Sequence, residues 1–410
     1  MPTFATNPSP FVYAALPVMQ EAAWLPGFLD DMHHQSHRSF RVVACVNQPD
    51  AWWEHSEKKA ICADNAECLR LLRKEQHFGI TLIDRSLPGR GWTGKQKGVG
   101  WARRLAMDAA ADMATKDDII VSVDADTRYG PEYFKEVVRA FEAFPGMAGL
   151  SLPYHHPLSG DPSADRAMLR YEIYMRVYAL NMLRIGSPYS FTAIGSAMAC
   201  TAGVYQRLGG MTPHEAGEDF YFLQKLRKSG PVCTWAETHA FPAARFSDRV
   251  IFGTGPAMIK GHRGDWSSYP VYHHSLFGKV KETCLLFSEL FERDTETPMS
   301  AFLREMYKTH DLWGPLRRNT TTRERFVRAC HQKTDALRIL QFLKATQPTL
   351  SKTDEECLKE FMEACCPMPG MPEFSKFGDL SMEELDRLRN HLETTEYNLR
   401  KQNPFNDTWQ

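Results

Sequence analysis

Two aspartates separated by a single residue, Asp124 and Asp126, follow the apolar run IIVSV. Successive side chains of an extended strand project to opposite faces, so residues two apart project to the same side. At the carboxyl end of a strand, such a pair lies at the usual ligand edge of an open α/β sheet. Mg²⁺ prefers oxygen ligands and commonly combines one or two carboxylates with substrate phosphates. The pattern therefore predicts a divalent-metal site for a nucleoside diphosphate; the alternative is that the two acids only cap the following helix.

A second acidic pair, Glu218 and Asp219, opens the segment GEDFYFLQKL, in which Phe222, Leu223 and Leu226 recur at helical spacing. A carboxylate at the start of a helix that is anchored to the core can be directed into a cleft. The adjacent Glu218 carboxylate raises the proton affinity of Asp219, which suits a general base. The alternative is that both acids only complement the helix dipole.

The elements that must position these acids alternate between short apolar runs and longer segments of helical period. This alternation is typical of βαβ units and predicts an α/β fold with a mostly parallel sheet. The expected strands lie at 11–18, 40–47, 79–86, 119–124 and 147–154, and crossover helices are expected after Lys95 and from Pro131.

The strand signals stop at about residue 277, and helical segments follow. Ser381 and Glu384 have the spacing of a capping box at the start of one of them. We therefore expect an α/β domain over residues 1–275, with the helical segment 168–184 inside it, and a helical C-terminal domain of unknown role over residues 276–410.

Composition excludes several classes of protein. The 410 residues are 43% hydrophobic and 24% charged, with a formal net charge of −1, so the overall field gives no reason to expect a nucleic-acid partner. No apolar run approaches the roughly 18 residues that span a bilayer, so no transmembrane segment is expected. The N-terminus lacks the basic segment and cleavage site of a secretory signal. We therefore expect a cytoplasmic protein, whose ten scattered cysteines stay reduced.

Several motifs together resemble one family. In chain order they are LPVMQE, VNQPD, LIDRS, GVGWARRLAMDAA, VSVDADT, GEDFYF and RFSDRVIFGTG, over about residues 10 to 255. The chain resembles the inverting nucleotide-sugar glycosyltransferases of the family 2 type, which include the cellulose, chitin and hyaluronan synthases. The resemblance implies a GT-A fold, a Rossmann-like mixed sheet flanked by helices, as the catalytic domain. The Gln-x-x-Arg-Trp motif of the processive synthases does not follow Asp219, which implies transfer of single sugars.

The resemblance also implies a role for each matched position. Asp219 would be the general base, with Glu218 beside it; Asp126 would bind the metal, and Asp124 would face the metal and the ribose. A later histidine completes the metal site of many GT-A enzymes, and His239 is the candidate here, the alternative being a surface-loop histidine. The residues implied for the nucleotide-sugar are Pro17, Val18, Glu21, Asn47 (where the family often has Asp), Asp84, Lys97 or Lys95, Arg103 and Asp124.

The function expected from these motifs is inverting transfer of a sugar from a nucleotide donor to an acceptor hydroxyl, with Mg²⁺ or Mn²⁺ as cofactor. A UDP-sugar is the favoured donor, a glycan or lipid-linked molecule the expected acceptor, and biosynthesis of surface polysaccharide or glycan the expected context. One rival is a sugar-nucleotidyltransferase, which would need a Gly-rich basic loop after the first strand, where this chain has LPVMQEAAW. Another rival is a non-catalytic scaffold that keeps the fold.

A basic run in the C-terminal region bears on localisation. It is either a solvated helix face or a surface for peripheral contact with anionic lipid at the inner face of the membrane. Its arginines are Arg317, Arg318, Arg323, Arg325 and Arg328.

Overall fold

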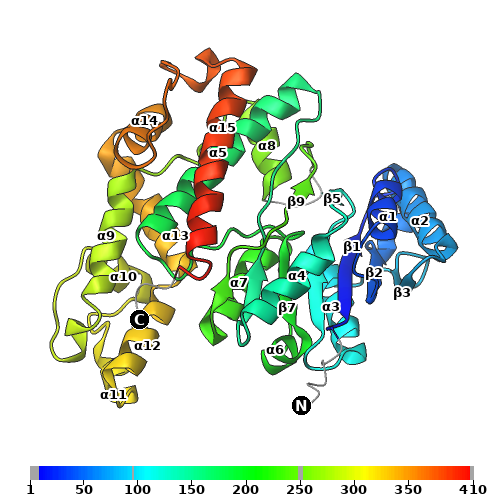
Figure 1. Cartoon of the computed structure of the whole chain (residues 1–410), viewed down its shortest axis with the longest axis horizontal. Helices are drawn as coiled ribbons and strands as arrows, with labels where there is room; N and C mark the ends of the chain where they lie inside the picture. Colours follow the sequence, from blue (N-terminus) through cyan, green and yellow to red (C-terminus); the bar gives the residue numbers. More distant parts are fainter. Residues whose placement is uncertain (1–8, 95–96, 248–252, 407–410) are drawn as a thin grey trace, which may run out of the picture. The chain divides into compact units, whose positions relative to one another are not determined.

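The structure, a computed structural model, describes residues 9–94, 97–247 and 253–406 (Figure 1). The chain forms two compact units. The first comprises Met1–Asp165 and Thr192–Ile259, and the second comprises Arg166–Phe191 and Lys260–Gln410. This division differs from the expected boundary at residue 275, because the chain enters the second unit twice.

The first unit contains a seven-stranded mixed sheet in the order β3-β2-β1-β4-β7-β6-β8. Strands β1 to β4 run parallel to one another, whereas β7 is antiparallel to both β4 and β6. The predicted α/β class and mixed sheet are therefore confirmed. The strands are β1 (Val12–Val18), β2 (Phe40–Asn47), β3 (Gly79–Arg85), β4 (Ile119–Ser122), β6 (Gly149–Ser151), β7 (Met198–Thr201) and β8 (Val232–Cys233), and a separate ladder joins β5 (Thr127–Tyr129) to β9 (Ala240–Pro242).

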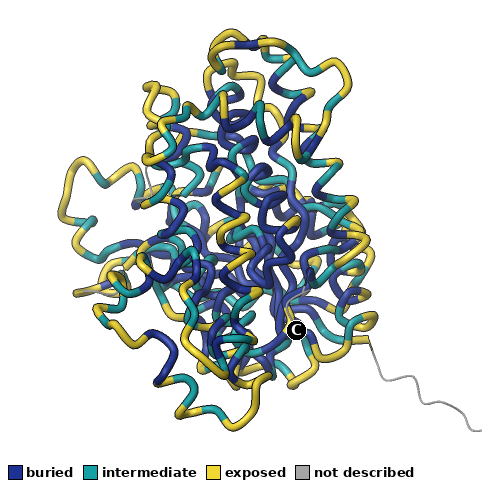
Figure 2. Tube along the Cα trace, turned by 90° about the vertical axis from the view of Figure 1, so that its left-hand side faces the viewer, coloured by how far each residue is buried: buried dark blue, intermediate teal, exposed yellow. Residues whose placement is uncertain are grey.

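The central strands are buried along their whole length. Every residue of β1 is buried, and all but one residue of β2. Parallel strands that are covered on both faces read as continuous apolar runs, which explains why the sequence pattern located them. Figure 2 marks the buried residues of the chain in dark blue.

Helices flank the sheet of the first unit. Helix α3 packs against β1 and β2, α2 against β2 and β3, and α7 against β6. The helices are α1 (Leu25–His33), α2 (Lys59–Lys74), α3 (Val99–Met113), α4 (Tyr133–Ala143), α6 (Ala202–Arg207), α7 (Glu218–Ser229) and α8 (Thr254–His262), with 3₁₀ turns η1 (Asp50–Glu54) and η2 (Ser56–Lys58); α8 ends in the second unit.

The second unit is helical. Helix α5 (Pro162–Arg184) contributes Leu169, Ile173 and Val177 to a buried core shared with α14 and α15. This packing places the segment 168–184 with the C-terminal helices and not with the sheet. The predicted capping box of Ser381 and Glu384 is present at the start of α15. The remaining elements are α9 (His274–Leu285), η3 (Glu289–Phe291), α10 (Ser300–Tyr307), α11 (Gly314–Asn319), α12 (Arg323–Lys333), α13 (Ala336–Thr346), η4 (Gln347–Leu350), α14 (Asp354–Cys365), η5 (Phe377–Asp379) and α15 (Met382–Gln402).

None of the helices in the described part of the chain is both long enough and apolar enough to cross a bilayer. All ten cysteines are free thiols.

Candidate active site

The carboxyl ends of β1, β2, β3 and β4 meet at one edge of the sheet because these strands are parallel. The residues that follow or end these strands are therefore neighbours at that edge, although they are far apart in sequence. Glu21 follows β1, Asn47 ends β2, Asp84 lies near the end of β3, and Asp124 follows β4.

Arg103 links the two acidic motifs. This residue of α3 is only 2% exposed. Its Nη2 donates to Asp124 Oδ1 at 3.0 Å and its Nε donates to Glu218 Oε1 at 3.0 Å. Its Nη1 donates to Ser122 Oγ at 2.6 Å and to the Gly195 carbonyl at 3.0 Å. One guanidinium thus joins the end of β4 to the start of α7.

Gly195 makes room for this guanidinium, and sequence reasoning missed it. A Cβ atom at position 195 would lie 2.7 Å from Arg103 Nη2 and 3.6 Å from Asp124 Oδ2. Only glycine therefore fits beside the Arg103–Asp124 ion pair without a shift. The small-residue run FTAIGSAMACTAG around it was the available signal.

Asp219 lies in the first turn of α7, as the sequence predicted. Its Oδ1 accepts a hydrogen bond from the Phe220 backbone N–H at 2.7 Å. Burial, reinforced by the Glu218 carboxylate, raises the pKa of Asp219 to about 7, against the opposing effects of that N–H and of Arg103. A general base is most effective when its pKa is near the working pH, so this carboxylate is suited to accept a proton.

The pKa of Asp124 is also raised. Burial raises the pKa of Asp124, Arg103 opposes the rise, and the nearby Asp126 and Glu218 carboxylates add to it. Crowded carboxylates of this kind favour the binding of a cation.

In the structure, the guanidinium of Arg245 provides a positive charge beside two of the acids at this edge, Asp126 and Glu21. Its Nε donates to Asp126 Oδ2 at 2.9 Å, and its Nη2 donates to Glu21 Oε1 at 2.8 Å and Oε2 at 3.0 Å. The Trp24 ring lies 5.0 Å from the guanidinium carbon. The sequence motif RFSDRVIFGTG begins with Arg245, but this arginine was not singled out; its place in that motif was the available signal.

The side-chain chemistry at this edge suits a hard divalent cation. Asp124, Asp126 and Glu21 offer carboxylate oxygens, the ligands that Mg²⁺ and Mn²⁺ prefer. The structure does not bring His239 to them. Ala243 N–H bonds to the Asp126 carbonyl, and His239 lies four residues away beyond the far end of the β5–β9 ladder, about 13 Å along an extended strand. Its ring stacks on Phe241.

Asn47 and Asp84 are bonded within the protein. The Asn47 amide donates to the Val18 carbonyl at 2.9 Å and accepts from Trp92 Nε1 at 3.0 Å. Asp84 Oδ1 accepts from the N–H and hydroxyl of Ser86 and so closes the turn after β3. Both residues therefore fix the backbone at the strand ends.

The other residues implied for the nucleotide differ in exposure. Pro17 and Val18 are buried at the end of β1. Lys97 is half-exposed, and its Nζ lies 3.2 Å from Glu215 Oε1 in the loop before α7. Lys95 lies outside the described residues.

A comparison with protein-family models matches residues 119–267 to the glycosyl transferase family group 2. The matched segment contains Asp124, Asp126, Asp219 and Arg245 and is less than half of the chain. It is a glycosyltransferase segment. The resemblance is thus confirmed at the level of glycosyltransferase, and the subtype of the cellulose, chitin and hyaluronan synthases stays a proposal. No curated protein matches the chain.

A comparison with solved structures gives matches of low identity and low TM-score. The mannosyltransferase PcManGT from Pyrobaculum calidifontis, in complex with GDP-Man and Mn²⁺, is 15% identical over 96% of this chain and 88% of its own, with a TM-score of 0.37. TarS 1–349 of S. aureus, in complex with UDP, is 12% identical over 94% and 91%, also at 0.37. GalNAc-T7 with UDP, GalNAc and Mn²⁺ is 10% identical over 90% and 60%, again at 0.37.

Proposed function

We propose that this protein is an inverting glycosyltransferase that moves a sugar from a nucleoside-diphosphate donor to the hydroxyl of a glycan or lipid-linked acceptor. The observation that carries the proposal is the link through Arg103, which joins Asp124 at the end of β4 to Glu218 at the start of α7. Through this link, Asp124, which would face the donor, and Glu218, the neighbour of the proposed base Asp219, lie in one cluster. A UDP-sugar is the first donor to test.

The proposed reaction is a single displacement. Asp219 takes the proton of the acceptor hydroxyl as the hydroxyl oxygen attacks the anomeric carbon. The new bond forms on the face opposite the leaving group, the bond between the anomeric carbon and the diphosphate oxygen breaks, and the nucleoside diphosphate leaves. Inversion follows, without a covalent enzyme intermediate.

Asp126 and Asp124 would hold Mg²⁺ or Mn²⁺, with Glu21 close by. When bound, the ion offsets negative charge on the leaving diphosphate. Arg245 would then release its hydrogen bonds to Asp126, and its guanidinium would be free to bond to a phosphate oxygen.

The proposed enzyme transfers single sugars, because the chain lacks the Gln-x-x-Arg-Trp motif after Asp219.

Contact with anionic lipid is not part of the proposal. In the basic run, Arg317 pairs with Asp294 at 2.7 Å, and Arg323 pairs with Glu292. These acids offset the charge that would attract a lipid surface, which favours the solvated helix face.

The decisive experiment incubates the protein and Asp219→Asn with a library of nucleotide-sugars and Mn²⁺, and measures released nucleoside diphosphate and donor binding. We expect Asp219→Asn to bind the donor normally and to lose at least about 100-fold in transfer, as expected for loss of a general base. Glu132→Gln is the matched control, because Glu132 is an exposed acid just before α4 that pairs with Lys135. Full turnover by Asp219→Asn would refute the assignment of the base.

A further inference from the structure

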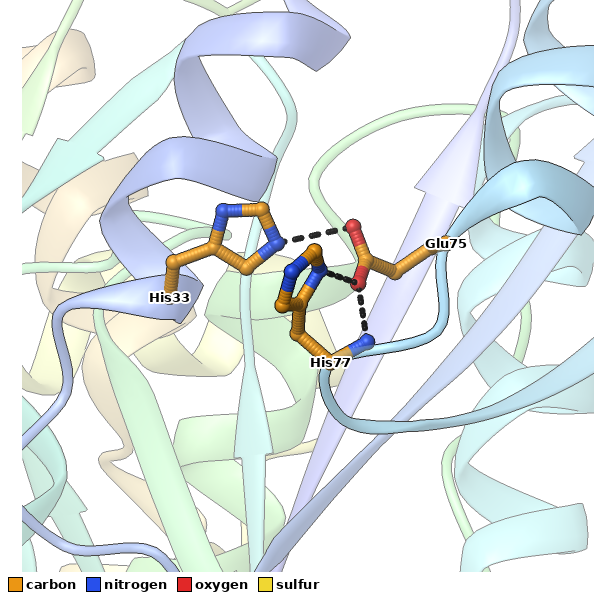
Figure 3. A group of neighbouring side chains, drawn as sticks. All are labelled: His33, Glu75 and His77. Carbon is orange, nitrogen blue, oxygen red and sulfur yellow. Dashed lines mark hydrogen bonds and ion pairs between the residues drawn. The ribbon is translucent and has the colours of Figure 1, made fainter.

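Two histidines and one glutamate of the first unit share a small cluster away from the acids of the sheet edge (Figure 3). His33 is the last residue of α1, Glu75 follows the end of α2, and His77 precedes β3. His33 Nε2 lies 2.8 Å from Glu75 Oε2, and His77 Nδ1 lies 3.0 Å from Glu75 Oε1. Trp24, whose ring lies beside Arg245, precedes the opposite end of α1. His33 is about 13 Å from that end along the helix, so the cluster is separate from the acids that Arg245 contacts.

We propose that His33, Glu75 and His77 form a binding site for Zn²⁺ that is separate from the proposed donor site. One ligand atom from each of the three residues lies within 4.8 Å of the other two. Two imidazole nitrogens and one carboxylate oxygen make a common zinc ligand set, and a fourth, tetrahedral position remains for water. Zn²⁺ binds such ligands at about 2.0–2.1 Å, which places tetrahedral ligand atoms about 3.3 Å apart. Each imidazole nitrogen is already 2.8–3.0 Å from an oxygen of Glu75, so modest side-chain movements, with loss of the shared protons, would bring the three ligand atoms to this spacing.

The carboxylate at the centre of the cluster is held in place. The Glu75 side chain is 6% exposed, and its Oε1 accepts from the backbone N–H of His77 at 2.6 Å. This backbone N–H is not one of the proposed ligand atoms, and its hydrogen bond orients the carboxylate, as is common for metal ligands.

The imidazole rings are partly fixed and still accessible. The His33 ring contacts the edges of His77 and Phe78, with centroids 4.6 Å and 5.4 Å away. The His77 side chain is 78% exposed, so an ion can reach the cluster from solvent. A bound ion would join the end of α1 to the connection between α2 and β3.

The test uses the whole protein, stripped with a chelator and without a nucleotide donor. Zn²⁺ binding is measured by calorimetry, and Co²⁺ binding by the visible absorption of tetrahedral Co²⁺. We expect one tetrahedral Co²⁺ site per chain, and its affinity should fall at least about 100-fold in His33→Ala and in His77→Ala, because even residues that only orient a ligand are worth 10–100-fold. Glu75→Gln should weaken Zn²⁺ binding as well. Because glutamine keeps the size of glutamate and can form hydrogen bonds, this variant still tests the site if an alanine variant does not fold.

Two controls separate this site from others. His34→Ala removes an exposed histidine whose ring bonds only to the Asp30 residue, and it should bind Zn²⁺ as the unaltered protein does. Asp126→Ala should also keep the Co²⁺ spectrum, so failure of the proposed transferase function would leave this result unaffected. Equal Zn²⁺ affinity in His33→Ala, or no stoichiometric binding by the unaltered protein, would overturn the proposal.

Discussion

Arg245 donates through Nε to Oδ2 of Asp126, the aspartate expected to bind the metal, at 2.9 Å. The same guanidinium bonds to Glu21. A cation from the protein thus occupies the carboxylate that a divalent ion would need. Arginine and metal are therefore expected to compete for Asp126.

Arg245→Ala should bind Mn²⁺ more tightly than the unaltered protein when no donor is present. The substitution removes charge-assisted hydrogen bonds worth roughly 1.5 kcal/mol or more, which corresponds to about tenfold in affinity. Titration followed by the electron paramagnetic resonance of free Mn²⁺ measures the change. Arg104→Ala is the control, since Arg104 pairs with Asp108 on α3. An unchanged Mn²⁺ affinity in Arg245→Ala would show that the ion pair between Arg245 and Asp126 does not compete with metal binding.

The transfer rate should depend on pH through Asp219, whose pKa is raised to about 7. The base must be unprotonated to accept the acceptor proton, so kcat/KM should fall about tenfold per pH unit below 7 and level off above it. A pH–rate profile with a saturating donor checks this. A profile that is flat between pH 5 and 8 would exclude Asp219 as the base.

Asp219→Asn should be more stable than the unaltered protein at pH 8. The pKa of Asp219 in the folded state is above the unfolded value of about 3.9. The folded state therefore has its full stability below about pH 4, where Asp219 is protonated, and loses stability as the pH rises through about 7 and the buried carboxylate ionises. Asparagine cannot ionise, so the variant avoids this loss. We expect a gain of roughly 1–3 kcal/mol at pH 8 that vanishes near pH 4. Urea unfolding at both pH values measures it, and an equal effect at both would contradict this account.

Gly195→Ala should displace the Arg103 guanidinium, because the added Cβ would lie 2.7 Å from Nη2. A loss of about 1–3 kcal/mol of stability is expected for such overpacking, together with a marked loss of transfer. Gly130→Ala is a matched control, since nothing lies within 4 Å of its added Cβ. Full activity of Gly195→Ala would indicate that Arg103 can shift without consequence.

The local parts of the site were predictable from sequence. The buried parallel strand before Asp124 reads as an apolar run, and Asp219 lies in the first turn of a helix whose apolar residues face the core. The partners of these residues were not predictable, because they lie far along the chain. Arg245 is 119 residues from Asp126, and Arg103 is 115 residues from Glu218. Nothing in local periodicity specifies such pairs.

The position of α5 was also beyond sequence reasoning. An amphipathic helix shows which residues are apolar but not which other element covers them. The sequence therefore placed residues 168–184 in the first domain, whereas Leu169 and Ile173 pack with the C-terminal helices. The place of His239 was not predictable for a similar reason, since the β5–β9 register decides which end of that ladder it occupies.

The two separate segments of the second unit restrict how the protein can be shortened. A chain cut at residue 275 would keep α5 but lose α14 and α15, which cover it. Leu169, Ile173, Val177 and Leu180 would then face water as a continuous apolar stripe, a surface prone to aggregation. A soluble minimal version of the sheet-containing unit would instead have to replace residues 166–191 with a short linker and end near residue 259.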